Sequence, residues 1–273
     1  MRLRVMKRVT ALLVLLAVGL ACSGDKTQSP TVVASTPVIG IYVDEGAAEA
    51  CVTAARNMFQ WMGYPTVMID AADIGSGALD SLSLVYFPGG WAGPYQDSLG
   101  DERGRRLRQF IEAGGAYVGV CAGGFLATRG YFWIDDQEST RNLLGIFPGR
   151  AAGPVDSIVP PPGIDMCRLD LAGEAHAITR GLPDTAWILY YTGPHFWPDS
   201  DLPIDTLATY SATGQVAIAT CEYGQGRVCV IGPHPEWEED SDRDSNSYFD
   251  DHDDRGSDWP LMKRITRWCL REL

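Results

Sequence analysis

The stretch 119–124, with the sequence GVCAGG, constrains the fold more than any other part of this chain. The apolar run 116–120 that leads into it predicts a buried strand, and residues 125–128 predict the continuation of a helix. A cysteine between glycines, at the point where a strand turns into a helix, is the pattern of a nucleophile elbow with Cys in place of Ser. This pattern predicts an α/β fold with a cysteine at a strand end.

The composition of this turn has a physical reason. Gly119 and Gly123 allow backbone segments to approach where a Cβ atom would clash. The helix that begins at Ala122 directs free N–H groups and the positive end of its dipole at the Cys121 sulfur, which favours the thiolate. The alternative is a buried, inert cysteine in a glycine-rich packing turn, and this stretch alone does not decide between the two.

Two further stretches favour the reactive thiol. Residues 226–232 predict a strand that runs into Pro233-His234-Pro235-Glu236. A histidine can accept the thiol proton, and a carboxylate two residues later can orient the imidazole. A strand-end glycine pair, Gly89-Gly90, follows another apolar run. Read separately, His234 and Glu236 fit a loop histidine beside a solvated glutamate equally well.

Together the three stretches resemble the class I glutamine amidotransferase-like superfamily, in the order Gly-Gly, Cys, His, Glu. The resemblance implies that Cys121 attacks a carbonyl, that His234 and Glu236 complete a triad, and that the backbone N–H groups of Gly90 and Ala122 form an oxyanion hole. It also implies a flavodoxin-like three-layer α/β sandwich with a mostly parallel central sheet and a strand-rich C-terminal half.

Within that superfamily the chain resembles the N-terminal amidotransferase-like domain of biotin–protein ligases, which also occurs as free-standing bacterial proteins. The resemblance rests on four segments and extends from about residue 38 to residue 273: 86–90, 119–124, 191–194 and 232–236. The ligase half is absent from this sequence, so we do not expect biotin ligation. The run 103–106 (RGRR) is only a superficial echo of a ligase motif.

Alternating apolar runs and amphipathic segments predict a parallel sheet covered on both faces, with ligands at the carboxyl ends of its strands. The expected strands and helices are 38–43, 47–62, 65–69, 82–87, 101–112, 157–159, 166–171, 186–191, 206–210, 216–220 and 259–270. Pocket specificity is expected from the loops 91–100, 131–142 and 193–201. We predict substrate contacts for Gly89, Trp91 and His195, although a turn packed by aromatic rings explains His195 equally well. His176 is expected to be structural.

Residues 1–21 combine a basic start with an apolar stretch too short to span a membrane permanently, as in a signal peptide. The end of this stretch resembles a bacterial lipobox, with Gly19 where a larger aliphatic residue is preferred, and implies lipidation of Cys22. Residues 22–36 predict a flexible tether and residues 37–273 a single domain. We expect an exported protein of the periplasm or cell envelope, with a lipid anchor as its only membrane contact.

Export affects the interpretation of the remaining cysteines: Cys51, Cys167, Cys221, Cys229 and Cys269. In an oxidising compartment some of them should pair, and a predicted hairpin turn lets Cys221 and Cys229 face each other. Whether they bond cannot be deduced from the sequence. None has the C-x-x-C spacing of a zinc site, so we expect no metal at the thiols and no cofactor.

The formal net charge of −13 argues against nucleic-acid partners. Acidic residues concentrate in residues 236–258, the acidic loop, which predicts a solvated, mobile segment. Asp242, Asp244, Asn246 and Asp250 are spaced like calcium ligands, but Ser247 occupies the position that needs glycine, so calcium is the less favoured alternative.

An exported chain with no synthase domain meets little ATP, so uncoupled hydrolysis fits better than ammonia transfer. We therefore expect a Cys-His-Glu hydrolase that cleaves an amide or peptide bond of a small molecule or peptide by way of a thioester. The alternatives are a non-catalytic small-molecule-binding module that retains the elbow cysteine, and a redox or scaffold role.

Overall fold

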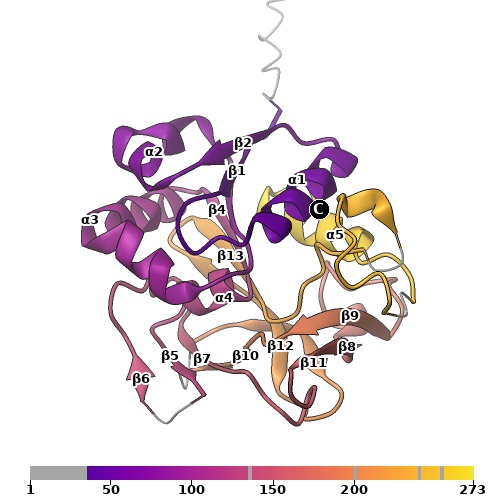
Figure 1. Cartoon of the computed structure of the whole chain (residues 1–273). Coiled ribbons are helices and arrows are strands. Elements are labelled where there is room, and N and C mark those ends of the chain that lie inside the picture. The colour runs from indigo at the N-terminus through magenta and orange to yellow at the C-terminus, as the bar shows by residue number, and fades with distance from the viewer. Residues whose placement is uncertain (1–35, 135–136, 200–201, 239–240, 253–254) are drawn as a thin grey trace, which may run out of the picture. The chain divides into compact units, whose positions relative to one another are not determined.

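The computed structural model describes residues 36–134, 137–199, 202–238, 241–252 and 255–273 (Figure 1). The predicted signal peptide, Cys22 and the predicted tether up to residue 35 lie outside the described residues. Residues 36–273 group into one compact unit. Among the described helices, none has the length and apolar character that crossing a membrane requires.

The N-terminal half alternates strands and helices, as the apolar runs predict. Its elements are β1 (Ile39–Tyr42), α1 (Glu49–Met62), β2 (Thr66–Ile69), α2 (Ala71–Ser76), β3 (Leu84–Phe87), α3 (Ala92–Glu112), β4 (Ala116–Val120) and α4 (Ala122–Ala127). The predicted helix 101–112 is only the second half of α3, which kinks at Gly100. The first half was missed because Gly93 and Pro94 are poor helix residues.

The C-terminal half is rich in strands: β5 (Gly130–Trp133), β6 (Glu138–Ser139), β7 (Gly149–Gly153), β8 (Ile164–Leu171), β9 (Thr185–Tyr191), β10 (His195–Pro198), β11 (Asp205–Tyr210), β12 (Val216–Tyr223) and β13 (Gly226–Ile231). Helix α5 (Trp259–Cys269) follows. The predicted strand 157–159 is wrong, because these residues form a turn with a hydrogen bond from the Ile158 N–H to the Val155 carbonyl.

One sheet has the order β2-β1-β3-β4-β13-β12-β10-β7-β5-β6, and β11, β8 and β9 branch from β12. The five strands from β2 to β13 in this order are parallel, and β12 is antiparallel to β13. The expected α/β fold with a parallel central sheet and a strand-rich C-terminal half is confirmed. The carboxyl ends of β3, β4 and β13 lie side by side, because Phe87 is paired with Gly119 and Val120 with Ile231.

Helices cover both faces of this parallel sheet, which gives the predicted three layers (Figure 1). On one face α1 and α5 contribute Phe59 and Met262 to a core that also holds Val118 and Cys121. On the other face α3 and α4 pack against Tyr117. Successive strand residues therefore point to opposite layers, as a strand buried on both sides requires.

The six described cysteines are all buried, and the two that the sequence predicted to face each other, Cys221 and Cys229, carry free thiols. Cys221 is paired with Val228 and Cys229 with Thr220, so the two side chains point to opposite faces of the sheet. The expectation that they face each other is wrong by one residue of register, and a shift of one residue moves a side chain to the other face.

Candidate active site

Cys121 occupies the turn between β4 and α4 with φ 48° and ψ −105°, a strained conformation for a residue other than glycine. The neighbouring glycines make this turn sterically feasible. A Cβ atom on Gly119 would lie 2.4 Å from the Gly123 carbonyl oxygen, and one on Gly123 would lie 2.2 Å from the Phe87 carbonyl oxygen. The close approach predicted for these two glycines is confirmed.

Two hydrogen bonds hold the strained turn in place. The Cys121 N–H donates to the carbonyl of Ile231 at 2.8 Å, which ties the turn to β13. The buried hydroxyl of Tyr117 donates to the carbonyl of Gly123 at 2.8 Å. A backbone conformation of this cost persists only where its surroundings fix it, and strain of this kind is frequent at functional sites.

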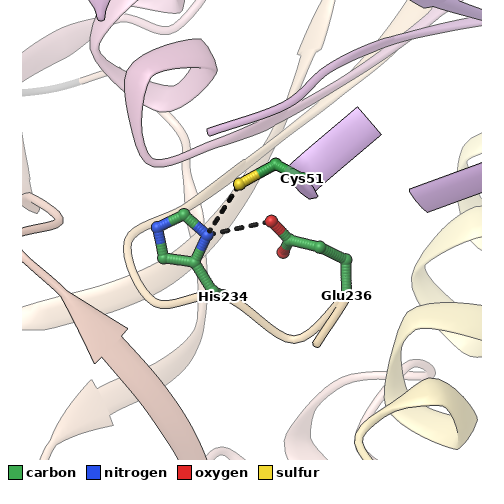
Figure 2. A group of neighbouring side chains, drawn as sticks. All are labelled: Cys51, His234 and Glu236. Atoms are coloured by element: carbon green, nitrogen blue, oxygen red, sulfur yellow. Dashed lines mark hydrogen bonds and ion pairs between the residues drawn. The ribbon is translucent and has the colours of Figure 1, made fainter. Parts of the chain in front are cut away.

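His234 and Glu236 lie in the loop after β13 and are 2 % and 0 % exposed. His234 Nδ1 lies 2.9 Å from Glu236 Oε1 (Figure 2). The loop is fixed from two sides, because the His234 N–H donates to the Leu189 carbonyl and the indole N–H of Trp259 donates to the Glu236 carbonyl. The carboxylate thus orients the imidazole ring.

The charge state of His234 follows from these neighbours. Burial alone would lower its pKa, but the Glu236 carboxylate and the adjacent Cys121 raise it well above the usual value. Among the described residues Nε2 has no hydrogen-bond partner, and the Cys121 sulfur lies 3.9 Å from the carbonyl oxygen of Tyr191. Catalytic hydrogen bonds are often long or poorly aligned in sites without a bound substrate, so this geometry is compatible with a thiol–imidazole pair.

The two predicted oxyanion donors, Gly90 and Ala122, follow the carboxyl ends of the neighbouring strands β3 and β4. Gly90 has φ 146°, and a Cβ atom there would lie 1.9 Å from the Gly46 carbonyl oxygen. The bridge between this turn and the α1 entrance uses the N–H groups of Ala48 and Trp91 and not that of Gly90. Ala122 is the first residue of α4, so its N–H has no acceptor within the helix.

A pocket of about 480 Å³ opens over these groups. Cys121, His234 and Gly90 line it, together with Cys51 on α1. Its other walls are mainly aromatic: Trp91, Trp133, Tyr191, Trp237, Tyr248 and Phe249. Glu49 is the one charged side chain among its described lining residues apart from His234. The pocket brings the predicted nucleophile, the predicted base and one predicted oxyanion donor, Gly90, to a single apolar cavity, and Ala122 is not among its lining residues.

Sequence and structure comparisons identify the family. The family model described as biotin-protein ligase, N terminal, matches residues 38–258. The chain belongs to this family. Its match to a biotin–protein ligase of Schizosaccharomyces pombe is 30% identical over 168 residues and covers 58% of this chain but 26% of the ligase. An uncharacterized protein of Chlamydia muridarum is 32% identical over 167 residues, which cover 58% of this chain and 62% of that protein.

Solved structures agree on the fold. A glutamine amidotransferase of Thermotoga maritima has a TM-score of 0.56 at 12% identity, covering 86% of this chain and 99% of that one. A ThuA-like protein of Bacteroides uniformis has a TM-score of 0.58 at 15% identity, covering 89% and 95%. The chain therefore has a class I amidotransferase-like fold. It spans less than two thirds of the length of either curated relative, the Schizosaccharomyces pombe ligase or the Chlamydia muridarum protein.

Not every predicted residue reaches the pocket in this member of the family. Trp91 lines it, and Gly89 lies behind it, where a Cβ atom would fall 2.3 Å from the His234 ring. His195 is not among the lining residues, and its ring lies 5.2 Å from that of Trp197. Its role in substrate binding stays a prediction without support from this geometry. His176 accepts a hydrogen bond from the Ile178 N–H at 3.1 Å and packs on Trp268, as a structural residue would.

The acidic loop departs from its prediction at a few anchoring residues that are buried, while about half of its described residues are exposed. Trp237, Glu238 and Asp244 are 3 %, 3 % and 1 % exposed. Asp244 accepts hydrogen bonds from the N–H groups of Glu238 and Asn246. Among the described residues, the three aspartates predicted as calcium ligands belong to no metal-binding group: Asp242, Asp244 and Asp250. The calcium alternative thus finds no cluster to support it. The loop instead supplies Tyr248 and Phe249 to the pocket wall.

Sequence reasoning missed Cys51 and Phe249 as site residues, whereas Tyr191 lies in the segment 191–194 that the resemblance singled out. Tyr248-Phe249 is an aromatic pair within an otherwise polar run, which is the one signal that could have indicated packing there. Cys51 is an ordinary buried position of an amphipathic helix, and only the tertiary fold reveals that it contacts His234.

Proposed function

We propose that this protein is a cysteine hydrolase that cleaves an amide or peptide bond. The observation that carries the proposal is the convergence of the strained elbow Cys121 and the buried His234–Glu236 pair on one pocket at the ends of adjacent parallel strands. An inert packing cysteine would require neither the strain at residue 121 nor a carboxylate-oriented histidine beside it.

The proposed reaction has two halves. The Cys121 sulfur attacks the amide carbonyl carbon while His234 Nε2 takes the thiol proton, and Glu236 stabilises the imidazolium. The N–H groups of Gly90 and Ala122 bind the oxyanion, a contribution of roughly 10²–10³ in rate in comparable sites. His234 then protonates the leaving amine, and a water molecule activated by the same nitrogen hydrolyses the thioester.

The pocket walls restrict the substrate class. Aromatic side chains favour a planar or apolar acyl group, and the described lining residues include no lysine or arginine. The α-carboxylate of free glutamine would find no side-chain counter-charge there, whereas Glu49 at the rim is compatible with a cationic group. The amide we expect is neutral or cationic and is carried by a small molecule or a short peptide.

A panel of aminoacyl coumarin amides with aromatic, cationic and acidic side chains tests the proposal. We expect release of the fluorescent amine from the aromatic and cationic members, with an acyl adduct on the Cys121 peptide in mass spectra after acid quenching. Cys121→Ser should abolish both signals. Equal turnover by wild type and Cys121→Ser would contradict the proposal.

A second candidate is a binding module that retains the elbow without turnover. It is favoured by the Cys121 sulfur lying 3.9 Å from the Tyr191 carbonyl while His234 Nε2 lacks a partner. In that case the aromatic amides should quench tryptophan fluorescence from Trp91 and Trp133 equally in wild type and Cys121→Ser, without any release of amine.

Export and lipid anchoring at Cys22 also belong to this proposal. They are supported by the basic start and apolar stretch within residues 1–21 and by the lipobox-like sequence that ends at Cys22. The full chain expressed in a bacterial host should partition into detergent and incorporate labelled fatty acid. Cys22→Ala should lose the label, and a label retained in that variant would exclude this anchor.

A further inference from the structure

A second thiol lies at the site beside the predicted nucleophile. Cys51, on α1, is 4 % exposed, and its sulfur lies 3.9 Å from His234 Nδ1. The same nitrogen lies 2.9 Å from Glu236 Oε1 (Figure 2). The sulfur, nitrogen and carboxylate oxygen all lie within 4.8 Å of one another, although residues 51 and 234 are 183 positions apart.

One carboxylate oxygen of this group is available to bind a metal ion. Glu236 Oε2 is buried and has no hydrogen-bond partner among the described residues. A Cβ atom on Gly89 would lie 2.3 Å from the His234 ring and 3.1 Å from the Cys51 sulfur, so the glycine permits ring and thiol to lie together. Cys51 and His234 both line the pocket, which gives an ion a route from solvent.

We propose that Cys51, His234 Nδ1 and Glu236 form a binding site for a zinc-class divalent ion. Sulfur, imidazole and carboxylate are the ligands that zinc accepts, at about 2.3, 2.0–2.1 and 2.0–2.2 Å. Tetrahedral angles at those lengths place the ligand atoms roughly 3.3–3.6 Å apart. The observed 2.9 and 3.9 Å separations need to change by about 0.3–0.5 Å, and the sulfur and carboxylate oxygen, which lie within 4.8 Å of each other, must approach to the same range.

The charges of this buried site balance. One thiolate and one carboxylate neutralise the two positive charges of the ion, so loading leaves no net charge in the protein interior. Binding releases the Cys51 thiol proton and, from the imidazolium form of His234, the Nδ1 proton. Zinc affinity should therefore rise with pH. A water molecule from the pocket completes the fourth position.

A consequence follows that rests on the proposed function. An ion on Nδ1 fixes the neutral ring in the tautomer that carries its proton on Nε2. In that form His234 cannot accept the Cys121 proton, and Glu236 no longer hydrogen-bonds to the ring. Zinc at this site should act as a reversible inhibitor of the thiol, which a chelator relieves.

Cobalt substitution in the chelator-treated full chain tests the site without reference to activity. We expect one Co²⁺ per chain and a thiolate-to-cobalt charge-transfer absorption in the near ultraviolet. Cys51→Ala should remove this absorption and weaken calorimetric Zn²⁺ binding at least about tenfold. Cys121→Ala, a matched loss of a thiol from the same pocket, should retain both.

Three results would overturn the proposed site: no stoichiometric binding, an absorption that survives in Cys51→Ala, or an absorption lost in Cys121→Ala. These readouts are distinct from amide hydrolysis. A protein that binds zinc through Cys51 but cleaves no amide leaves the site intact and removes the hydrolase proposal. A metal-free protein that cleaves amides but binds no zinc would remove the zinc site and leave the hydrolase proposal intact.

Discussion

At the scale of single residues, the site depends on positions that tolerate only one type of residue. Gly123 is the clearest of these, because its Cα lies against the end of β3 and a methyl group would fall 2.7 Å from the Phe87 Cβ atom. Cys121 is strained because its neighbours hold it there. Substitutions at such positions report on the elbow directly.

Gly123→Ala should lower the free energy of unfolding by about 1–3 kcal/mol, because the added methyl overpacks a contact with backbone that cannot move away. Gly93→Ala is the matched control, since a Cβ atom there meets nothing within 4 Å. The control lies in α3 and should be neutral or stabilising by up to about 1 kcal/mol. Urea denaturation measures both, and equal losses in the two variants would contradict the tight elbow.

His195 provides a test of pH dependence. Burial lowers its pKa from 6.5 to about 4, and neither ring nitrogen has a hydrogen-bond partner among the described residues. The unfolded chain therefore takes up a proton that the folded chain excludes. The contribution of the neutral His195 to the free energy of unfolding is fully present above pH 6.5. It falls by about 1–3 kcal/mol as the pH falls from 6.5 toward 4.

His195→Phe should remove this loss, because phenylalanine has no proton to accept and can still stack on Trp197. The difference in free energy of unfolding between variant and wild type should grow as the pH falls from 6.5 to 4. A constant difference across this range would argue against the lowered pKa. Unchanged amide cleavage would count against the predicted role of His195 in substrate binding.

At the scale of elements, the Arg243 side chain joins the acidic loop to α1 and α5, in addition to the hydrogen bonds from Asn57 on α1 to Asp244 and Ser245. The Arg243 guanidinium lies 4.1 Å from the Trp259 ring centroid and 5.6 Å from that of Trp61, and it forms an ion pair with the buried Glu238. Loss of this side chain would remove the cation paired with the buried Glu238 carboxylate, which also accepts a hydrogen bond from the Ser257 hydroxyl. The pocket wall at Phe249 depends on the same loop.

Arg243→Ala should therefore destabilise the fold by about 2–3 kcal/mol and increase amide hydrogen exchange in residues 241–252. Arg106→Ala is the control, because its ion pair with Glu102 at 3.6 Å joins two exposed side chains on one helix. That change should cost less than about 0.5 kcal/mol. Equal effects of the two substitutions would show that the loop is not anchored by Arg243.

At the scale of the whole molecule, sequence patterns predicted the elements whose local pattern is strong. The strands of the parallel sheet are continuous apolar runs, so these strands were predicted, together with the functional residues at their ends: Gly90, Cys121 and His234. β7 was missed because Gly149–Gly153 reads GRAAG, with no apolar alternation. Cys51 was missed because its contact with His234 depends on how α1 packs across the sheet. The acidic loop was misread because its charges mask the few aromatic residues that anchor it.

Two thiols of similar burial in one pocket allow a direct test of the central claim, that Cys121 is an activated nucleophile. Cys121 and Cys51 are 6 % and 4 % exposed, so a difference in reactivity reports activation rather than access. Burial raises the pKa of Cys51, which should keep its thiol protonated and slow to react. Each chain thus carries its own reference thiol.

The measurement is the rate of iodoacetamide alkylation at pH 7 of the metal-free protein, followed at each cysteine by peptide mass spectrometry. The account predicts that Cys121 reacts at least about tenfold faster than Cys51 and slows about tenfold in His234→Gln. Circular dichroism establishes that the variant is folded. Equal rates at the two cysteines, or a Cys121 rate unchanged in His234→Gln, would contradict the triad.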